Sequence, residues 1–378
     1  MNNKNYQGIS IIRIIIKSVS LLILFNFLFI LCRNIPYGSF SLYNAVFPGR
    51  ERLPFGETPN DSFNITISNL DAMLNSHKIS ADKKSESDYR IIILGDSSIW
   101  GFLQKPEETL AGLIEMENDF ECGEKKIEVF NLGYPSLSIV KDLLILNKIK
   151  AYDPDLILWF VTLESLVSDE QLDIPLVKNN PLELNRVIDK YQLSYPKTEI
   201  NLLDYSIIGQ RRNLADIIRL QLHGVNWAGT GIDLVIPEKY TPAMRDFEAD
   251  DSFKDFTVRK LHPGDLAIEV VTNTVAEFNE VDFLVINEPI LISNGVNSTI
   301  RYNYYYPRWA YDDFRNIIEP VLRQSGIKYY DFWDLIPEVE FTNSAIHLTN
   351  AGENILAAET IALIKQNCES REENEKTS

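Results

Sequence analysis

The segment from residue 89 to residue 101 constrains the fold of this chain more than any other. It begins with an apolar run, residues 89–94, that is typical of a buried strand, and the run stops at Gly95-Asp96-Ser97. An amphipathic segment beginning near Glu107 follows. Open α/β sheets bind their ligands at the carboxyl ends of parallel strands. A serine at that edge, with its hydroxyl held by backbone on both sides, is in the expected position of a nucleophile.

Short apolar runs alternate with segments of helical periodicity along the chain. The predicted strands are residues 89–94, 127–132, 156–161, 283–287 and 328–332. The predicted helices are residues 107–117, 138–149, 309–324 and 350–365. This alternation is typical of a parallel sheet with helices on both faces. We therefore expect an α/β fold, a three-layer sandwich around a central parallel sheet of five strands.

The interval between the third and fourth predicted strands is far longer than a crossover helix needs. Residues 210–222 carry apolar side chains at helical spacing, and prolines punctuate the sequence on either side. We predict a mainly helical insertion at about residues 166–280, over the carboxyl edge of the sheet. The domain itself is predicted at residues 89–366, with a disordered polar tail at residues 367–378.

An apolar segment near the N-terminus predicts an uncleaved membrane anchor. Residues 14–32 are mostly apolar, and about 20 residues span a bilayer. A cleaved signal peptide is the alternative, but residues 31–36 lack the small residues of a cleavage site. Basic residues are more numerous before the span than after it, which favours a cytoplasmic N-terminus and an extracytoplasmic domain in a single-pass cell-membrane protein. Residues 1–33 are thus the cytoplasmic end and anchor, and the proline-broken residues 34–88 are a juxtamembrane stalk.

Charge and cysteine content exclude several classes of protein. The net charge of −18 argues against nucleic acid as a partner, because an acidic protein and a phosphate backbone repel each other. Cys32, Cys122 and Cys368 show no metal-site spacing. Cys122 and Cys368 are able to pair, but isolated thiols are the preferred interpretation. The sequence contains no phosphate-binding loop, dinucleotide fingerprint or zinc motif, so we expect neither cofactor nor metal.

A second motif, far downstream, supplies a base for Ser97. His347 lies within residues 343–352, just before an apolar helical segment at residues 355–364. The alternatives are a turn or helix-cap role for Ser97, common after Gly-Asp, and a helix-start role for His347. A hydroxyl nucleophile and a histidine base are the pair that covalent acyl transfer needs.

In the segments around Ser97 and His347 the chain resembles the GDSL-type esterase and acyltransferase family, the SGNH hydrolases, whose sequences share four conserved blocks. Gly95-Asp96-Ser97 with Gly101 matches the family's first block, and residues 344–347 with Gly352 resemble its last block. Residues 131–136 and 162–165 resemble the two middle blocks more loosely. The resemblance covers residues 89–365 without the insertion. It implies a flavodoxin-like fold, a nucleophilic serine, a histidine base and no cofactor.

Two positions depart from the family pattern. The Asp that stands three residues before the histidine in the family is Ser344 here, which offers a hydrogen bond but no charge. The Asn of the third block aligns with Glu164, and an ionised carboxylate cannot donate to an oxyanion. Glu164 either points elsewhere while Thr162 or Ser165 donates, or is kept protonated by burial, or is the relocated acid of the triad. A one-residue shift of the alignment is equally open.

The resemblance implies an oxyanion hole built mainly from backbone. Its expected donors are the N–H groups of Ser97 and of Gly133 or Ser136, with Thr162 as a further candidate. All four follow predicted strands, so they are expected at the same edge of the sheet.

Four further residues are candidates for substrate contact. Asn287 and Glu288 end the fourth predicted strand, and Arg301 and Trp309 flank a tyrosine-rich run whose rings would stack on a sugar. The alternative roles are strand capping for the first two and loop packing for the other two.

Together these features predict a membrane-anchored extracytoplasmic serine esterase or O-acyltransferase. The expected partners are the membrane, through the N-terminal helix, and an ester or acylated glycan; the resemblance suggests acetylated envelope polysaccharide. The alternative is a catalytically inactive relative, in which Ser344 and Glu164 have removed the chemistry and left a glycan-binding or assembly protein.

Overall fold

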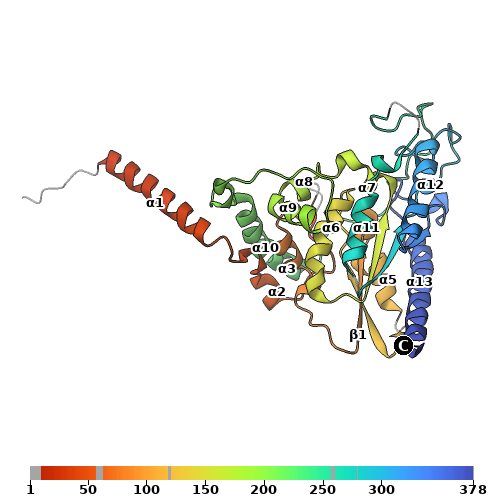
Figure 1. Cartoon of the computed structure of the whole chain (residues 1–378), viewed down its shortest axis with the longest axis horizontal. Helices are drawn as coiled ribbons and strands as arrows, with labels where there is room; N and C mark the ends of the chain where they lie inside the picture. The colour runs from red at the N-terminus through yellow and green to blue at the C-terminus, as the bar shows by residue number, and fades with distance from the viewer. Residues whose placement is uncertain (1–9, 57–62, 118–120, 257–259, 279, 378) are drawn as a thin grey trace, which may run out of the picture.

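The computed structural model describes residues 10–56, 63–117, 121–256, 260–278 and 280–377. The chain forms an α/β fold in which helices cover both faces of one central sheet, as the alternating pattern predicts (Figure 1). The strands are β1 Asp88–Leu94, β2 Glu121–Cys122, β3 Lys125–Asn131, β4 Leu156–Val161, β5 Asp282–Asn287 and β6 Lys328–Asp331.

The sheet has six strands in the order β2-β3-β1-β4-β5-β6. Strands β3, β1, β4, β5 and β6 are parallel, and their order is that of flavodoxin-like sheets. The short strand β2 pairs antiparallel with β3 at the edge. The predicted sheet of five strands was therefore incomplete, because a two-residue strand is too short to show a period in the sequence.

Alternate residues of the central strands supply two cores. Ile92 and Leu94 of β1 belong to the core beneath the helical layer that includes α6, whereas Ile91 and Ile93 belong to the core beneath α5 and α13. Strands buried on both faces tend to be apolar at every position, which explains the continuous apolar runs of β4 and of residues 91–94 in β1. The helices that cover the sheet are α5 Leu110–Met116, α6 Ile139–Ile149, α11 Ile268–Glu277, α12 Arg308–Gln324 and α13 Asn350–Thr377.

The insertion between β4 and β5 is helical in its first part and again at α11, directly before β5. Its helices after β4 are α7 Leu163–Leu166, α8 Pro175–Lys178, α9 Pro181–Lys190 and α10 Arg211–Thr230, with the 3-10 turn η6 Leu202–Tyr205. Residues 231–256 then run as an irregular segment up to the next undescribed residues. The prediction of a mainly helical insertion at about residues 166–280 thus fits α7 to α10 and α11 but not the irregular segment at residues 231–256.

Residues 34–88 were predicted as a stalk, but their described parts, residues 34–56 and 63–88, pack onto the domain. They contain helices α2 Leu42–Val46 and α3 Leu70–Ser76. Leu53, Ile67 and Met73 are fully buried in the core that includes α6. The guanidinium of Arg52 donates to the carbonyl oxygen of Gly101 at 2.7 Å, so this segment also supports the turn after Ser97. The prolines break regular structure as expected, but apolar residues such as Leu53, Ile67 and Met73 belong to the core.

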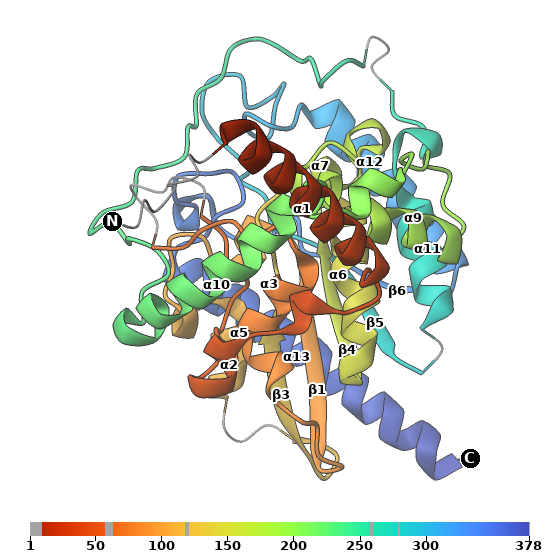
Figure 2. The same cartoon turned by 90° about the vertical axis from the view of Figure 1, so that its left-hand side faces the viewer.

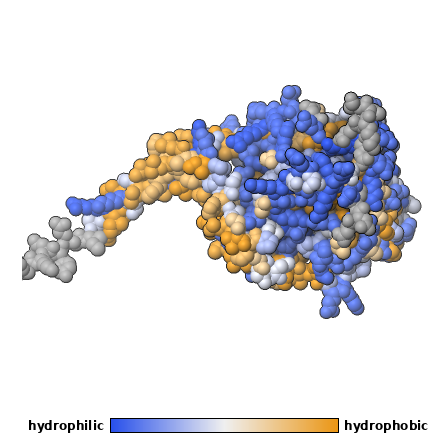
Figure 3. Space-filling view, turned by 90° about the horizontal axis from the view of Figure 1, so that it is seen from below, coloured by the Kyte–Doolittle hydropathy of each residue, from blue (hydrophilic) through white to orange (hydrophobic). Residues whose placement is uncertain are grey.

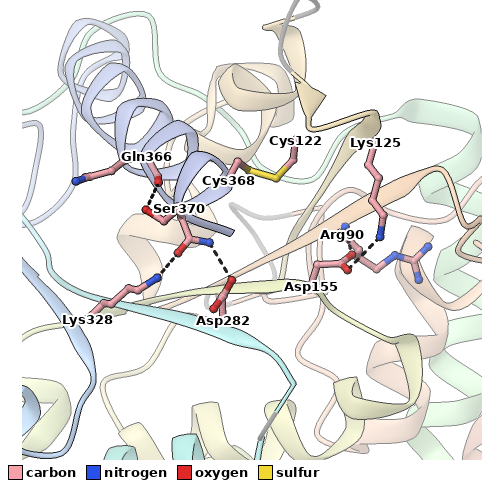
Figure 4. Close-up of a disulfide and its surroundings, with 10 residues drawn as sticks. Arg90, Cys122, Lys125, Asp155, Asp282, Lys328, Gln366, Cys368 and Ser370 are labelled. Atoms are coloured by element: carbon pink, nitrogen blue, oxygen red, sulfur yellow. Dashed lines mark hydrogen bonds and ion pairs between the residues drawn. A yellow bond between two sulfur atoms is a disulfide. The ribbon is translucent and has the colours of Figure 1, made fainter. Parts of the chain in front are cut away.

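The C-terminal helix is fixed to both edges of the sheet. A disulfide joins Cys122 of β2 to Cys368 of α13, so the expectation of isolated thiols was wrong (Figure 4). At the other edge, Lys328 Nζ donates to Asn367 Oδ1 at 2.6 Å, and the Asn367 amide donates to Asp282 at 3.1 Å. Helix α13 therefore continues through most of the tail that was predicted to be disordered.

The N-terminal helix α1, Ile11–Leu31, projects from the body with its side chains exposed (Figure 3). Among the described residues it is the one helix long and apolar enough to cross a membrane, with a mean hydropathy of 2.5 over its most apolar window. A helix that is mostly apolar on every side and has no side chain buried by the protein is typical of a membrane segment.

Candidate active site

Ser97 begins helix α4, Ser97–Trp100, directly after β1. The Asp96 side chain caps this helix by accepting a hydrogen bond from the backbone N–H of Ser98 at 2.8 Å. Gly101 ends the helix with a φ of 83°, a conformation that favours glycine. The Gly-Asp-Ser block therefore folds into a tight strand-to-helix turn that presents the Ser97 hydroxyl at the carboxyl edge of the sheet.

The structure brings His347 against Ser97 across 250 residues of sequence. His347 Nε2 lies 2.8 Å from Ser97 Oγ, which is hydrogen-bonding distance. The loop that carries His347 is held by backbone hydrogen bonds, from Thr342 N to His347 O at 2.8 Å and from Leu291 N to Ala345 O at 2.7 Å. The two residues thus meet in the geometry of a nucleophile and its general base.

The other ring nitrogen of His347 is bound by Asn343, which the sequence did not single out. His347 Nδ1 lies 3.1 Å from Asn343 Oδ1. Because an amide oxygen only accepts, Nδ1 carries the proton and Nε2 is left to accept the proton of Ser97. Ser344, predicted for this role, instead accepts a hydrogen bond from the Tyr304 hydroxyl at 3.3 Å. A neutral amide therefore replaces the carboxylate, as the Asn does in Cys-His-Asn proteases.

Burial lowers the pKa of His347 from its ordinary value of 6.5 to about 4. The Phe102 ring covers the imidazole, with the two ring centroids 4.8 Å apart. Burial disfavours the charged imidazolium, and the neutral partner Asn343 does not compensate for it. The imidazole is therefore neutral, and able to accept a proton, over a wide range of pH.

Glu164 lies in the first turn of α7, and its carboxylate pairs with Lys254 rather than with His347. The distance from Glu164 Oε1 to Lys254 Nζ is 2.7 Å, and the same ammonium also pairs with Glu170. The geometry therefore does not support the hypothesis that Glu164 is the relocated acid. The Lys254 ammonium comes from the irregular part of the insertion, so this ion pair joins α7 to that segment.

Among the predicted oxyanion donors, Ser136 has an unusual backbone conformation. Its φ of 145° lies in a region that side-chain-bearing residues rarely adopt. Gly133 N instead donates to Asn131 Oδ1 at 3.1 Å. A Cβ on Gly133 would lie 2.7 Å from the backbone nitrogen of Trp100, so this glycine permits close packing against α4. Thr162 is fully buried, and its hydroxyl lies 3.1 Å from the Tyr306 hydroxyl.

Three of the four residues considered for substrate contact have structural hydrogen bonds. Asn287 donates to Asp331 at 2.8 Å and accepts from the Tyr311 hydroxyl at 3.0 Å. The Arg301 guanidinium donates to five backbone carbonyl oxygens at 2.9–3.1 Å. Trp309 Nε1 donates to a backbone carbonyl of the insertion at 2.8 Å. Their polar groups are engaged within the protein, so loop and strand packing explains them.

The fourth, Glu288, lies directly behind the nucleophile turn. Its Oε2 accepts a hydrogen bond from Ser98 Oγ at 2.6 Å, and its carboxyl lies close enough to that of Asp96 for each to influence the pKa of the other. Burial and the negative charge of Asp96 raise the pKa of Glu288 well above its ordinary value of 4.5. Both effects favour the protonated form of Glu288 beside Asp96. This pair joins the ends of β1 and β5, a contact that no local sequence signal indicates.

No family model matches the chain, and a search of curated proteins finds no match. The solved structures that it resembles include esterases and acylhydrolases, all at low identity. They include a lipolytic protein of the G-D-S-L family from Desulfitobacterium hafniense (12% identity, 73% of this chain and 99% of that chain, TM-score 0.34). A second is a lipase/acylhydrolase from Enterococcus faecalis, with 14% identity over 74% of this chain and 96% of that chain and a TM-score of 0.36. A third is a carbohydrate acetylesterase from Sinorhizobium meliloti, with 10% identity over 73% of this chain and 98% of that chain and a TM-score of 0.35. At such low similarity, conclusions about chemistry depend on the site itself.

Proposed function

We propose that this protein is a serine esterase that works through Ser97, His347 and Asn343. The observation that carries the proposal is the continuous hydrogen-bonded row from Ser97 Oγ through the imidazole to Asn343 Oδ1, with distances of 2.8 and 3.1 Å. In this row the imidazole has the tautomer that a general base needs, and a second residue fixes the plane of its ring.

In the proposed reaction, Ser97 Oγ attacks the ester carbonyl carbon while His347 Nε2 takes the hydroxyl proton. The backbone N–H of Ser97 lies at the start of α4 and has no partner within that helix, so it donates to the oxyanion together with the backbone N–H of Ser136 in the loop after β3. The C–O bond of the ester then breaks, and the alcohol leaves with the proton from His347. Water, or a sugar hydroxyl in a transferase reaction, resolves the acyl-enzyme.

We place the catalytic domain outside the cytoplasm, anchored by α1. The Cys122–Cys368 disulfide supports this placement, because disulfides persist in oxidising compartments and are rare in the cytosol. An esterase held at the outer face of a cell membrane meets the envelope, so we propose acylated envelope glycan as the substrate class. Tyr304 and Tyr305, beside the His347 loop, are half-buried rings able to stack on a sugar.

A fluorophosphonate probe on the purified full-length protein tests the nucleophile. We expect covalent labelling of the wild type, none in Ser97→Ala, and undiminished labelling in Ser325→Ala, which removes an exposed hydroxyl elsewhere. Hydrolysis of a small acetyl ester should follow the same pattern. If the folded wild type takes up no label, the alternative of a glycan-binding protein without esterase chemistry is favoured instead.

A further inference from the structure

Large apolar side chains remain exposed at the end of the body from which α1 projects. They come from α2, from the η6 region and from α10, and each is more than half exposed. We call this set the apolar face: Leu42, Val46, Leu203, Ile208, Ile218 and Leu222. Figure 2 shows α2 and α10 at this end of the body, and Figure 3 shows apolar surface continuing from α1 onto it.

The orientation of α10 is fixed from its inner side, so the exposure of its outer side is not incidental. Asp216 accepts hydrogen bonds from the backbone N–H groups of Ser68 and Asn69 at 2.7 and 3.0 Å. A Cβ on Gly224 would lie 2.4 Å from the Tyr43 ring, so α2 packs directly on α10. A helix held this firmly leaves its outer stripe facing away from the protein.

The apolar face reaches the depth of the membrane anchor. The backbone N–H of Ile208 donates to Asn26 Oδ1 at 3.3 Å, and Asn26 lies within α1. At a rise of about 1.5 Å per residue, Asn26 is roughly 7.5 Å inside the Leu31 end of that helix. Elements that lie in the membrane interface bury their apolar side by about 5–10 Å. Ile208 would therefore sit at interfacial depth whenever α1 spans the bilayer.

The charges around the apolar face differ from those of the whole chain. Although the net charge is −18, exposed arginines border this face, with Glu199 and Asp204 as exposed acids among them. The arginines are Arg33, Arg211, Arg212 and Arg219. Guanidinium groups bind phosphate well, so the border suits phospholipid headgroups while the centre suits their acyl chains.

We propose that the apolar face docks on the phospholipid surface, so that the domain lies against the bilayer instead of hanging from α1. This inference rests on the proposed anchorage by α1. In Figures 1 and 2 the strands run across the direction in which α1 projects. Docking therefore leaves the carboxyl edge of the sheet, with Ser97, open along the membrane surface to a polymeric substrate.

Depth-dependent fluorescence quenching in vesicles tests the docking. The full-length protein with Cys32→Ser is reconstituted in phosphatidylcholine vesicles, and an environment-sensitive dye is attached to one introduced cysteine. The sites are Leu222→Cys in the apolar face, Ile23→Cys in α1, and Val339→Cys, which is similarly exposed but lies outside the face. We expect shallow doxyl-labelled phosphatidylcholine to quench the dye at position 222 but not at position 339. Ile218→Cys repeats the measurement should the first variant fold poorly.

The three sites distinguish the possible failures. Quenching at position 23 without quenching at positions 218 and 222 would overturn the docking and leave the anchorage intact; a contact with a second protein copy gives the same result. A lack of quenching at position 23 would overturn anchorage and docking together. Neither result bears on the esterase chemistry, which the fluorophosphonate experiment measures separately.

Discussion

At the scale of residues, the site depends on the neutral partner of His347. Only the neutral imidazole accepts a proton, so kcat/KM should fall at acidic pH as His347 becomes charged, at about pH 4. Asn343→Asp places a carboxylate beside Nδ1, favours the imidazolium and should move this acidic limb to higher pH. Asn343→Leu should lower kcat about 100-fold or more, because the ring loses its orientation. The pH profile of ester hydrolysis checks both, and an acidic limb unmoved by Asn343→Asp would contradict the assignment.

The buried pair of Glu288 and Asp96 should make folding stability depend on pH. Because the folded-state pKa of Glu288 is raised, its stabilising effect is complete below its ordinary value of 4.5. The effect is then lost as the pH rises through the folded-state pKa. Glu288→Gln keeps an amide that can donate toward Asp96 but does not titrate. It should therefore flatten the dependence of unfolding free energy on pH, and the total change removed is about 1.4 kcal/mol for each unit by which the pKa of Glu288 is shifted. Urea unfolding of both proteins from pH 5 to 9 measures this pH dependence. The same pH dependence in Glu288→Gln would contradict the role assigned to the Glu288 and Asp96 pair.

At the scale of elements, the nucleophile is positioned by the packing of α4 against the loop after β3. Gly133→Ala would place a methyl group 2.7 Å from the backbone of α4 and push Ser97 away from His347. We expect kcat/KM to fall roughly 100-fold, since a displacement of about 1 Å is enough for such a loss. Gly264→Ala, where the added methyl meets open space, is the matched control and should leave the ester-hydrolysis rate unchanged.

At the scale of the whole molecule, one disulfide closes most of the catalytic domain. The Cys122–Cys368 bond spans 246 residues of sequence, and a long closed loop restricts the unfolded chain most. The double variant Cys122→Ser, Cys368→Ser should lose about 2–5 kcal/mol of unfolding free energy. Denaturant unfolding measures this loss, with Cys32→Ser as the control for removal of a free thiol. A double variant as stable as the control would contradict the role of the bond.

The sequence by itself determined the α/β class, the five parallel strands, the apolar N-terminal helix and the pairing of Ser97 with His347 as candidates. Each depends on a local signal, either a period of apolar residues or a turn motif next to a strand, and such signals reflect which face of an element is buried.

Only the tertiary structure decided which partners these residues have. Asn343 rather than Ser344 or Glu164 binds the imidazole, Glu288 stands behind the nucleophile, and Cys122 reaches Cys368. Hydrogen bonds and disulfides between distant segments depend on the three-dimensional path of the loops. Residue types and their spacing along the chain do not indicate that path. For the same reason, the sequence did not show that apolar side chains within the predicted stalk pack into the core with the helices around α6.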